Sequence, residues 1–187
     1  MKTLKLFILL YIVSLNFINA QTIVDLDSRD GERTLNTYYK DTQNKLNQFE
    51  GTWVYDDGVS YIKFVLIKKY QFPVENYFED LIVGEFQYKK NGQEIINTLN
   101  NLNYNDSYNY KIRGNHFWYN ISPFRNYTSD NFRLETRITE NGHLSDLDMR
   151  TLTNNGQQIM QIFKSRASIY YEYLPIIPEG FYYLTKQ

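Results

Sequence analysis

Few side chains of this chain are suited to acid–base or metal chemistry. It contains two histidines, His116 and His143, and no cysteine, so the usual zinc ligand sets are missing. His143 stands near Asp146 and Asp148, just after an Asn-Gly pair, and we interpret this cluster as a solvated turn. We predict no metal site and no cofactor.

Other patterns come near a calcium site or a nucleophile site without meeting its requirements. DLDSRDG, at residues 25–31, has acidic spacing like a calcium loop, but Arg29 occupies a ligand position and Asn36 stands where a bidentate acid belongs. Neither Ser60 nor Ser122 lies in a nucleophile-elbow sequence, and no glycine-rich phosphate loop opens a helix. We therefore predict no catalytic residues and a protein that is not an enzyme.

Aromatic side chains offer binding chemistry instead, since the chain has 18 Tyr, 12 Phe and 2 Trp. Around the mouth of a barrel they would bury a small apolar ligand. Exposed tyrosine and tryptophan would also stack on sugar rings or anchor a protein partner, and a third interpretation is ordinary core and loop packing. Our candidate ligand-binding residues surround a predicted loop at residues 122–123: Phe117, Trp118, Tyr119, Phe124 and Tyr127.

Residues 1–20 have the parts of a secretory signal peptide. Lys2 and Lys5 give a positive start, residues 6–13 form an apolar run too short to span a bilayer, and small Ala20 precedes Gln21 at the cleavage position. No later stretch approaches the roughly 20 apolar residues of a membrane helix. We predict export to the periplasm or the extracellular medium, with no membrane span.

The rest of the composition describes one domain that depends on its core. Without the two lysines of residues 1–20, about 18 basic residues stand against 21 acidic ones, a net charge of about −3 that does not favour a nucleic-acid partner. The chain cannot form disulfides, but about 165 residues can bury an ordinary core. We divide the chain into the signal peptide at 1–20, a polar segment at 21–36 that we expect to be loose, and one domain at 37–187.

Alternating patterns divide that domain into short strands. Residues 60–70 place Ile62, Phe64 and Leu66 on one face, and residues 132–139 alternate apolar or Thr side chains with charged or Thr ones. A period of two is typical of half-buried strands. The dipeptides between the patterns favour tight hairpin turns: Asp57-Gly58, Asn91-Gly92, Asn141-Gly142 and Asn155-Gly156.

Three other segments are less regular. Residues 93–103 fit a strand or a short helix, and KIRGNHFWYN at 111–120 fits one strand or a hairpin broken at Gly114. Residues 37–49 are expected to form a short helical turn before the strands. Together these elements predict an all-β fold, an antiparallel up-and-down β-barrel of roughly eight or nine strands. An open sandwich is the alternative that the same pattern allows.

The first strand begins at Phe49-x-Gly51-Thr52-Trp53, directly after the predicted helical turn. This order of elements resembles the start of lipocalin-like proteins. The resemblance implies that Gly51 permits a tight turn into the strand and that Trp53 plugs the closed end of the barrel. It also implies that Lys186, in the terminal Leu184-Thr185-Lys186, covers Trp53.

The chain also resembles an uncharacterised family of small secreted Bacteroidota proteins. The resemblance lies in the signal ending in NAQT, in YYKDTQNKLNQFEGTW at 38–53 and in the closing LTK. The function of that family is unknown, so the resemblance implies a compartment and a barrel-like fold and nothing catalytic.

Two hypotheses for the function follow. The protein is an exported lipocalin-like protein that binds a small apolar ligand in the barrel, or it is a non-catalytic structural or protein- or glycan-interaction module of the cell envelope. In the second case the barrel is filled by its own side chains. The sequence leaves both hypotheses open, because the inward positions combine bulky Phe and Tyr with Gly84 and Thr136.

Overall fold

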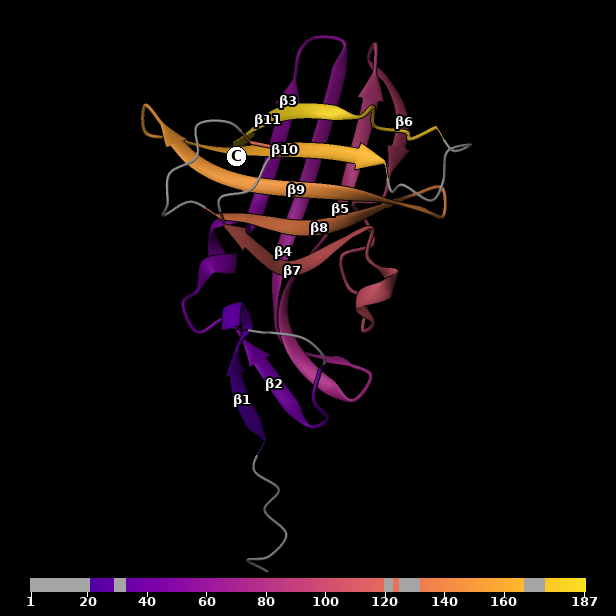
Figure 1. Cartoon of the computed structure of the whole chain (residues 1–187). Helices are drawn as coiled ribbons and strands as arrows, with labels where there is room; N and C mark the ends of the chain where they lie inside the picture. Colours follow the sequence, from indigo (N-terminus) through magenta and orange to yellow (C-terminus); the bar gives the residue numbers. More distant parts are fainter. Residues whose placement is uncertain (1–20, 29–32, 120–122, 125–131, 167–173) are drawn as a thin grey trace, which may run out of the picture.

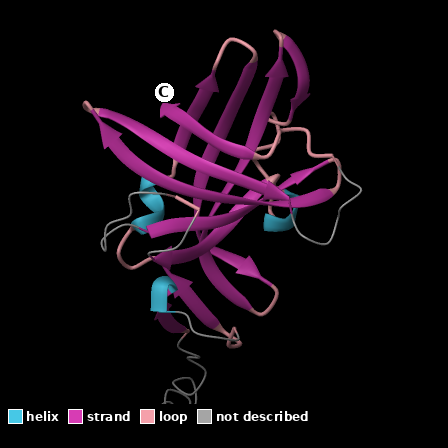
Figure 2. Cartoon of the chain, turned by 45° about the horizontal axis from the view of Figure 1, so that its top comes forward, coloured by secondary structure: helices cyan, strands magenta, loops and turns pink. Residues whose placement is uncertain are grey.

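The computed structural model describes residues 21–28, 33–119, 123–124, 132–166 and 174–187. Over these residues the chain is all-β, with eleven strands in one sheet and three single-turn 3-10 helices (Figures 1 and 2). None of the described helices is long and apolar enough to cross a membrane. The strands are Thr22–Asp25 (β1), Thr37–Lys40 (β2), Gly51–Asp56 (β3), Ser60–Val74 (β4), Tyr77–Lys90 (β5), Gln93–Asn97 (β6), Ile112–Tyr119 (β7), Phe132–Glu140 (β8), His143–Asn154 (β9), Gln157–Arg166 (β10) and Gly180–Lys186 (β11), and the helices are Leu26–Ser28 (η2), Lys45–Gln48 (η3) and Ser107–Asn109 (η4).

Eight of these strands close into an antiparallel barrel. Strands β3, β4 and β5 are consecutive neighbours, β5 pairs with β7, and β7 to β11 continue round the barrel until β11 pairs with β3. Figure 1 shows β7 to β10 crossing in front of β4 and β5. This order confirms the predicted up-and-down barrel and excludes the open sandwich, because the eight strands leave no unpaired edge among themselves.

The Asn-Gly pairs form the hairpin turns that the sequence predicts. Asn91 and Gly92 have φ angles of +51° and +77°, and the pairs at 141–142 and 155–156 are alike. Positive φ at both central residues is typical of the type I′ turn, whose twist matches that of the flanking strands. These turns join β5 to β6, β8 to β9 and β9 to β10 in antiparallel register.

Two segments that the sequence left open are strands. Residues 93–97 form β6, which pairs with β5 away from the main path of the sheet. Residues 112–119 form the single strand β7, whose register with β8 shifts between Arg113 and His116. The extra residue at this irregularity keeps Arg113 and His116 on one face of the sheet although they are three positions apart.

The N-terminal part differs from the sequence-based expectation. The helical turn predicted for residues 37–49 is confined to Lys45–Gln48, and the segment 21–36, predicted to be loose, contains strand β1. Strand β2 pairs in parallel with β1 and with β5. The long β4–β5 hairpin extends beyond the barrel and offers its edge to β2 (Figure 1), and this distant pairing overrides the weak local helical pattern.

The interior of the barrel is packed with its own side chains. A cavity that could hold a water molecule would leave some accessible surface on the side chains that line it, and a large group of inward-facing side chains has none. These side chains therefore leave no water-sized space beside them in this region of the described strands. These fully buried side chains are Ile62, Phe64, Phe86, Ile112, Leu134, Ile138, Leu147, Met149, Met160, Ile162 and Leu184.

A buried ion pair lies toward each end of the barrel. At the end covered by η3, Lys68 Nζ is 2.8 Å from Asp41 Oδ2. At the other end, Lys164 Nζ is 2.8 Å from Glu140 Oε2, and both of these side chains are fully buried. Glu140 Oε1 also accepts a 2.8 Å hydrogen bond from the backbone N–H of Ile177. Each pair allows charged groups to be buried because the partner compensates the lost hydration.

Candidate functional site

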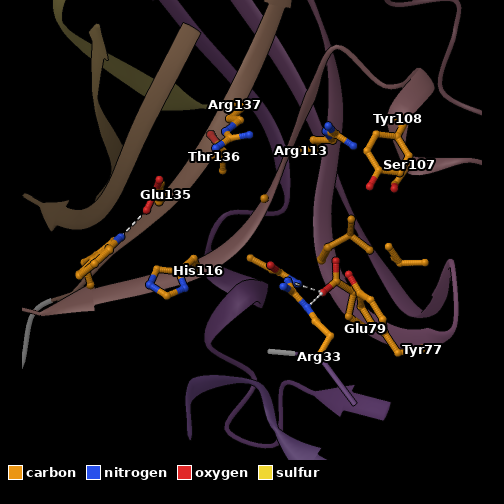
Figure 3. Close-up of a pocket in the computed structure, with 15 residues that line it drawn as sticks. Arg33, Tyr77, Glu79, Ser107, Tyr108, Arg113, His116, Glu135, Thr136 and Arg137 are labelled. Atoms are coloured by element: carbon orange, nitrogen blue, oxygen red, sulfur yellow. Dashed lines mark hydrogen bonds and ion pairs between the residues drawn. The ribbon is translucent and has the colours of Figure 1, made fainter. Parts of the chain in front are cut away.

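A pocket of about 480 Å³ lies on the outer wall of the barrel, where β5, β7 and β8 meet the N-terminal part of the chain (Figure 3). Its lining combines charged side chains with exposed and half-buried rings, whereas the barrel interior is mostly apolar. The charged side chains are Arg33, Glu79, Arg113, Glu135 and Arg137, and the rings are Tyr77, Tyr108, His116 and Trp118.

Backbone rather than side chain forms part of the floor, at Gly114. A Cβ atom at this position would lie 2.4 Å from the carbonyl oxygen of Glu135 and 2.6 Å from the Cα of Thr136. Glycine therefore allows β7 and β8 to approach closely here. The floor belongs to two paired barrel strands, which gives the site a rigid base.

An ion pair between the N-terminal part and β5 forms one wall. Two guanidinium nitrogens of Arg33, Nη2 and Nε, donate to Glu79 Oε2 at 3.0 and 3.3 Å. The guanidinium carbon of Arg33 also lies 5.1 Å from the ring centroid of Tyr77. Glu79 is buried, so Arg33 compensates much of the hydration that this carboxylate loses.

Two arginines stand together on the opposite wall. Arg113 of β7 and Arg137 of β8 are directly paired in the β7–β8 ladder. The guanidinium carbon of Arg113 lies 3.9 Å from the ring centroid of Tyr108, and Figure 3 shows the side chains of Arg113 and Tyr108 next to each other. Both guanidinium groups are positively charged, so this wall has a local excess of positive charge. Like charges placed directly opposite each other on a strand pair are destabilising.

Trp118 and Glu135 form a third part of the lining. The indole N–H of Trp118 donates a hydrogen bond to Glu135 Oε2, and its ring centroid lies 4.7 Å from that of His116. Trp118 remains 37% exposed. The hydrogen bond fixes the ring while leaving part of its surface open to a ligand.

The four predicted ligand-binding residues in the described part of the chain do not form one barrel mouth. Phe117 and Trp118 are neighbours on β7, so their side chains point to opposite faces: Phe117 is buried in the core, and Trp118 lines the outer pocket. Phe124 is buried, with its ring centroid 6.0 Å from that of Phe181. Tyr127 lies outside the described residues.

Tyr119 lies instead in a cluster at the η3 end of the barrel. Its hydroxyl donates to Asp27 and accepts a 2.6 Å hydrogen bond from Lys45 Nζ. Burial raises the pKa of Tyr119, and the hydrogen bond to Asp27 raises it further. Burial alone would lower the pKa of Lys45, but its bonds to Asp27 and Tyr119 outweigh this and raise it. The cluster fastens η2 and η3 to the end of β7.

The three residues predicted to form the plug lie together at the same end. Trp53 is fully buried, and its indole N–H donates to the carbonyl oxygen of Phe49 at 2.8 Å. Lys186 is paired with Trp53 in the β11–β3 ladder, and its Nζ lies 5.2 Å from the Trp53 ring. Gly51 has a φ of +128°, and a Cβ atom there would lie 2.8 Å from Lys186 Cε.

Sequence reasoning missed the charged residues of the outer pocket. The alternation of β8 placed Glu135 and Arg137 on the polar face, which was a usable signal that they point outward. Nothing local showed that Arg113 would pair with Arg137, because the register shift in β7 determines that contact. Arg33 and Glu79 are 46 positions apart, and only the docked N-terminal part brings them together. Among the described residues, no three His, Asp or Glu side chains converge as a metal site would require.

Comparison with known proteins identifies a family for the chain but no function. A family model with the description "Family of unknown function (DUF6705)" matches residues 1–186. No curated protein matches the chain, and no solved structure matches it.

Proposed function

The chain belongs to DUF6705, a family of unknown function, and from this premise we propose that it is an exported, non-catalytic glycan-binding module. In this proposal the sugar lies in the pocket on the outer wall, and the barrel is the scaffold that holds the pocket. The observation that carries the proposal is the pocket itself, about 480 Å³ in volume, where the rings of Tyr108 and Trp118 stand among charged side chains.

Burial favours the outer pocket over the barrel interior. A closed barrel of eight strands is compatible with a ligand chamber. However, side chains at its centre such as Phe64, Phe86 and Met149 have no accessible surface. A ligand inside would have to displace packed side chains, and such rearrangement of a core is costly. The outer pocket is already open.

The lining of the pocket suits a sugar better than a lipid. Pockets for apolar ligands are lined predominantly by apolar side chains with few polar groups, whereas this one contains five charged side chains. A sugar ring presents a C–H face that packs on an aromatic ring and a hydroxyl rim that hydrogen-bonds to charged groups. Tyr108 is 57% exposed, so its ring, like that of Trp118, is accessible for such packing.

The engagement of the pocket carboxylates supports a non-catalytic role. Glu79 is bound by Arg33, and Glu135 accepts the indole N–H of Trp118. Both contacts hold neighbouring side chains of the pocket in place, which is a structural use of the two carboxylates. We therefore propose that a bound oligosaccharide is released unchanged, which chromatography after prolonged incubation would test.

We expect the folded protein to bind at least one member of an oligosaccharide panel with a Kd between about 10 μM and 1 mM, or about −7 to −4 kcal/mol. Trp118→Ala and Tyr108→Ala should each weaken binding about 2- to 10-fold, because an aromatic contact contributes about 0.5–1.5 kcal/mol. Isothermal titration calorimetry measures both effects. Tyr183→Ala is the matched control, since Tyr183 is also exposed but lies on β11, outside the pocket.

Two results would contradict this function. One is the absence of saturable binding by every sugar when circular dichroism shows folded protein. The other is saturable uptake of a fluorescent fatty acid that Trp118→Ala does not alter, which would instead favour the apolar ligand in the barrel.

Export has a separate test. Expressed in a Gram-negative host, the chain should lose residues 1–20 and be recovered from the periplasm or medium beginning at Gln21, because Ala20 is a suitable cleavage residue. Ala20→Phe should block this cleavage. Mass spectrometry of the purified protein gives the N-terminus, and an uncleaved leader on the soluble wild-type protein would contradict export by this route.

A further inference from the structure

We propose that the sugar bound in the outer pocket is acidic and that Arg113 and Arg137 together bind its carboxylate or sulfate group. This inference rests on the proposed glycan-binding function and names its ligand class. The two guanidinium groups come from directly paired positions of β7 and β8, and both line the pocket. Such a like-charged pair is unfavourable in the empty site, and an anion between the two groups would remove the repulsion.

The surrounding charges leave the arginine wall positive. Arg33 and Glu79 form an ion pair and neutralise each other. Glu135 contributes one negative charge, but its Oε2 accepts the indole N–H of Trp118. The pocket therefore has a net positive charge, which favours an anionic group by simple Coulomb attraction.

A neighbouring acid on β9, Asp146, is not among the residues that line the pocket. Asp146 is paired with Arg137 in the β8–β9 ladder. Even so, no ion pair joins the two side chains among those of the described residues. Arg137 is exposed, and its guanidinium is accessible to a ligand from the solvent.

The shape of the wall suits an oxyanion attached to a ring. Planar guanidinium groups donate two parallel hydrogen bonds, a geometry that matches carboxylate and sulfate oxygens. The ring of Tyr108 lies 3.9 Å from the Arg113 guanidinium carbon and restricts its orientation, so less side-chain freedom is lost on binding. An anion held between the arginines would place the attached sugar ring over the floor between Tyr108 and Trp118, both of which line the pocket.

The experiment compares an acidic with a neutral sugar of the same length. Trigalacturonate and a sulfated oligosaccharide are titrated beside a neutral trigalactose, with inorganic sulfate as the bare anion. The wild-type protein should bind an acidic sugar about tenfold more tightly than the neutral one at low salt, and added NaCl should reduce the difference because these charges are exposed. Comparison of the carboxylated and the sulfated probe decides which acid group is preferred.

Variants then assign the preference to the arginine pair. Arg113→Gln/Arg137→Gln should bind the acidic and the neutral sugar with similar affinity, and its affinity for the neutral sugar should match that of the wild type. Thermal melting would verify its fold. Lys40→Gln/Lys90→Gln removes the same charge from two exposed positions outside the pocket and should keep the wild-type preference. Arg137→Lys should keep part of it, since the charge remains without the planar fork.

The possible failures are distinguishable. Equal binding of acidic and neutral sugars by the wild-type protein, an unchanged preference in the arginine double variant, or tighter binding of bare sulfate than of any acidic sugar would overturn this inference. The first two would leave the glycan-binding function standing. Absence of binding by every sugar would overturn that function, and with it the inference.

Discussion

Trp53→Ala is expected to lower the free energy of unfolding by about 3–5 kcal/mol, as comparable truncations of buried aromatic residues do. Trp53 is fully buried, and its indole N–H donates to the Phe49 carbonyl oxygen at 2.8 Å. The substitution leaves a cavity at the η3 end and removes that donor. Because a domain has only about 5–15 kcal/mol of total stability, the variant should unfold at a much lower urea concentration or fail to accumulate.

Lys186→Met is the matched control for this prediction. Its methylene stem would still cover the ring, so the loss should be limited to the cation–π contribution of about 0.5–2 kcal/mol. The loss of stability in Trp53→Phe should lie between those of Trp53→Ala and Lys186→Met, because Trp53→Phe keeps an aromatic ring and loses the hydrogen bond. Unfolding is followed by far-ultraviolet circular dichroism, because the substitution removes one of the two tryptophans of the chain. A Trp53→Ala protein with the wild-type urea midpoint would show that Trp53 is not a structural plug.

The second large effect is expected at the ion pair in the other end of the barrel. Lys164→Met should cost about 3–5 kcal/mol, because it leaves the carboxylate of Glu140 buried without its cation. Glu140 and Lys164 have no exposed side-chain surface, and their charged atoms are 2.8 Å apart. Glu140→Gln should also be destabilising, because it leaves the ammonium group of Lys164 buried without its anion. Urea titrations at neutral pH measure both variants.

The exposed ion pair between Arg166 and Glu179 provides the matched control. It has the same 2.8 Å separation, but its side chains are 28% and 44% exposed. Arg166→Gln should therefore cost at most about 1 kcal/mol. The double variant Lys164→Met/Glu140→Leu should recover part of the stability, since it leaves no buried charge but removes the acceptor of the Ile177 N–H. A Lys164→Met protein no less stable than Arg166→Gln would contradict the buried pair.

Much of the fold could be predicted from the sequence, because its signals are local. The alternation in residues 60–70 depends only on successive side chains pointing to opposite faces, and Asn91-Gly92 forms the turn that its own φ preferences favour. Enough such hairpins in a row specify an up-and-down order. The prediction for residues 21–40 was wrong because the pairing that orders them is not local. Strand β2 pairs with β5 at Tyr38 and Phe78, and this contact left no trace in the local sequence pattern.

The candidate site depended on contacts that the sequence does not encode locally. The aromatic run at 117–119 marked binding chemistry, yet strand geometry placed Phe117 in the core and Trp118 on the outer wall. The register shift in β7 brought Arg113 opposite Arg137. Composition could not show whether the barrel is packed, because packing depends on how inward side chains from all eight strands fit together.

The sequence by itself determined most strands of the barrel and their hairpin turns, because each rests on neighbouring residues and the backbone preferences that they share. It left β6 and β7 open and missed β1 and β2. Only the tertiary structure decided where a ligand can lie. The packing of the barrel interior depends on side chains from all eight strands, and the charges of the outer pocket depend on distant residues, such as Arg33 and Glu79, meeting across the fold.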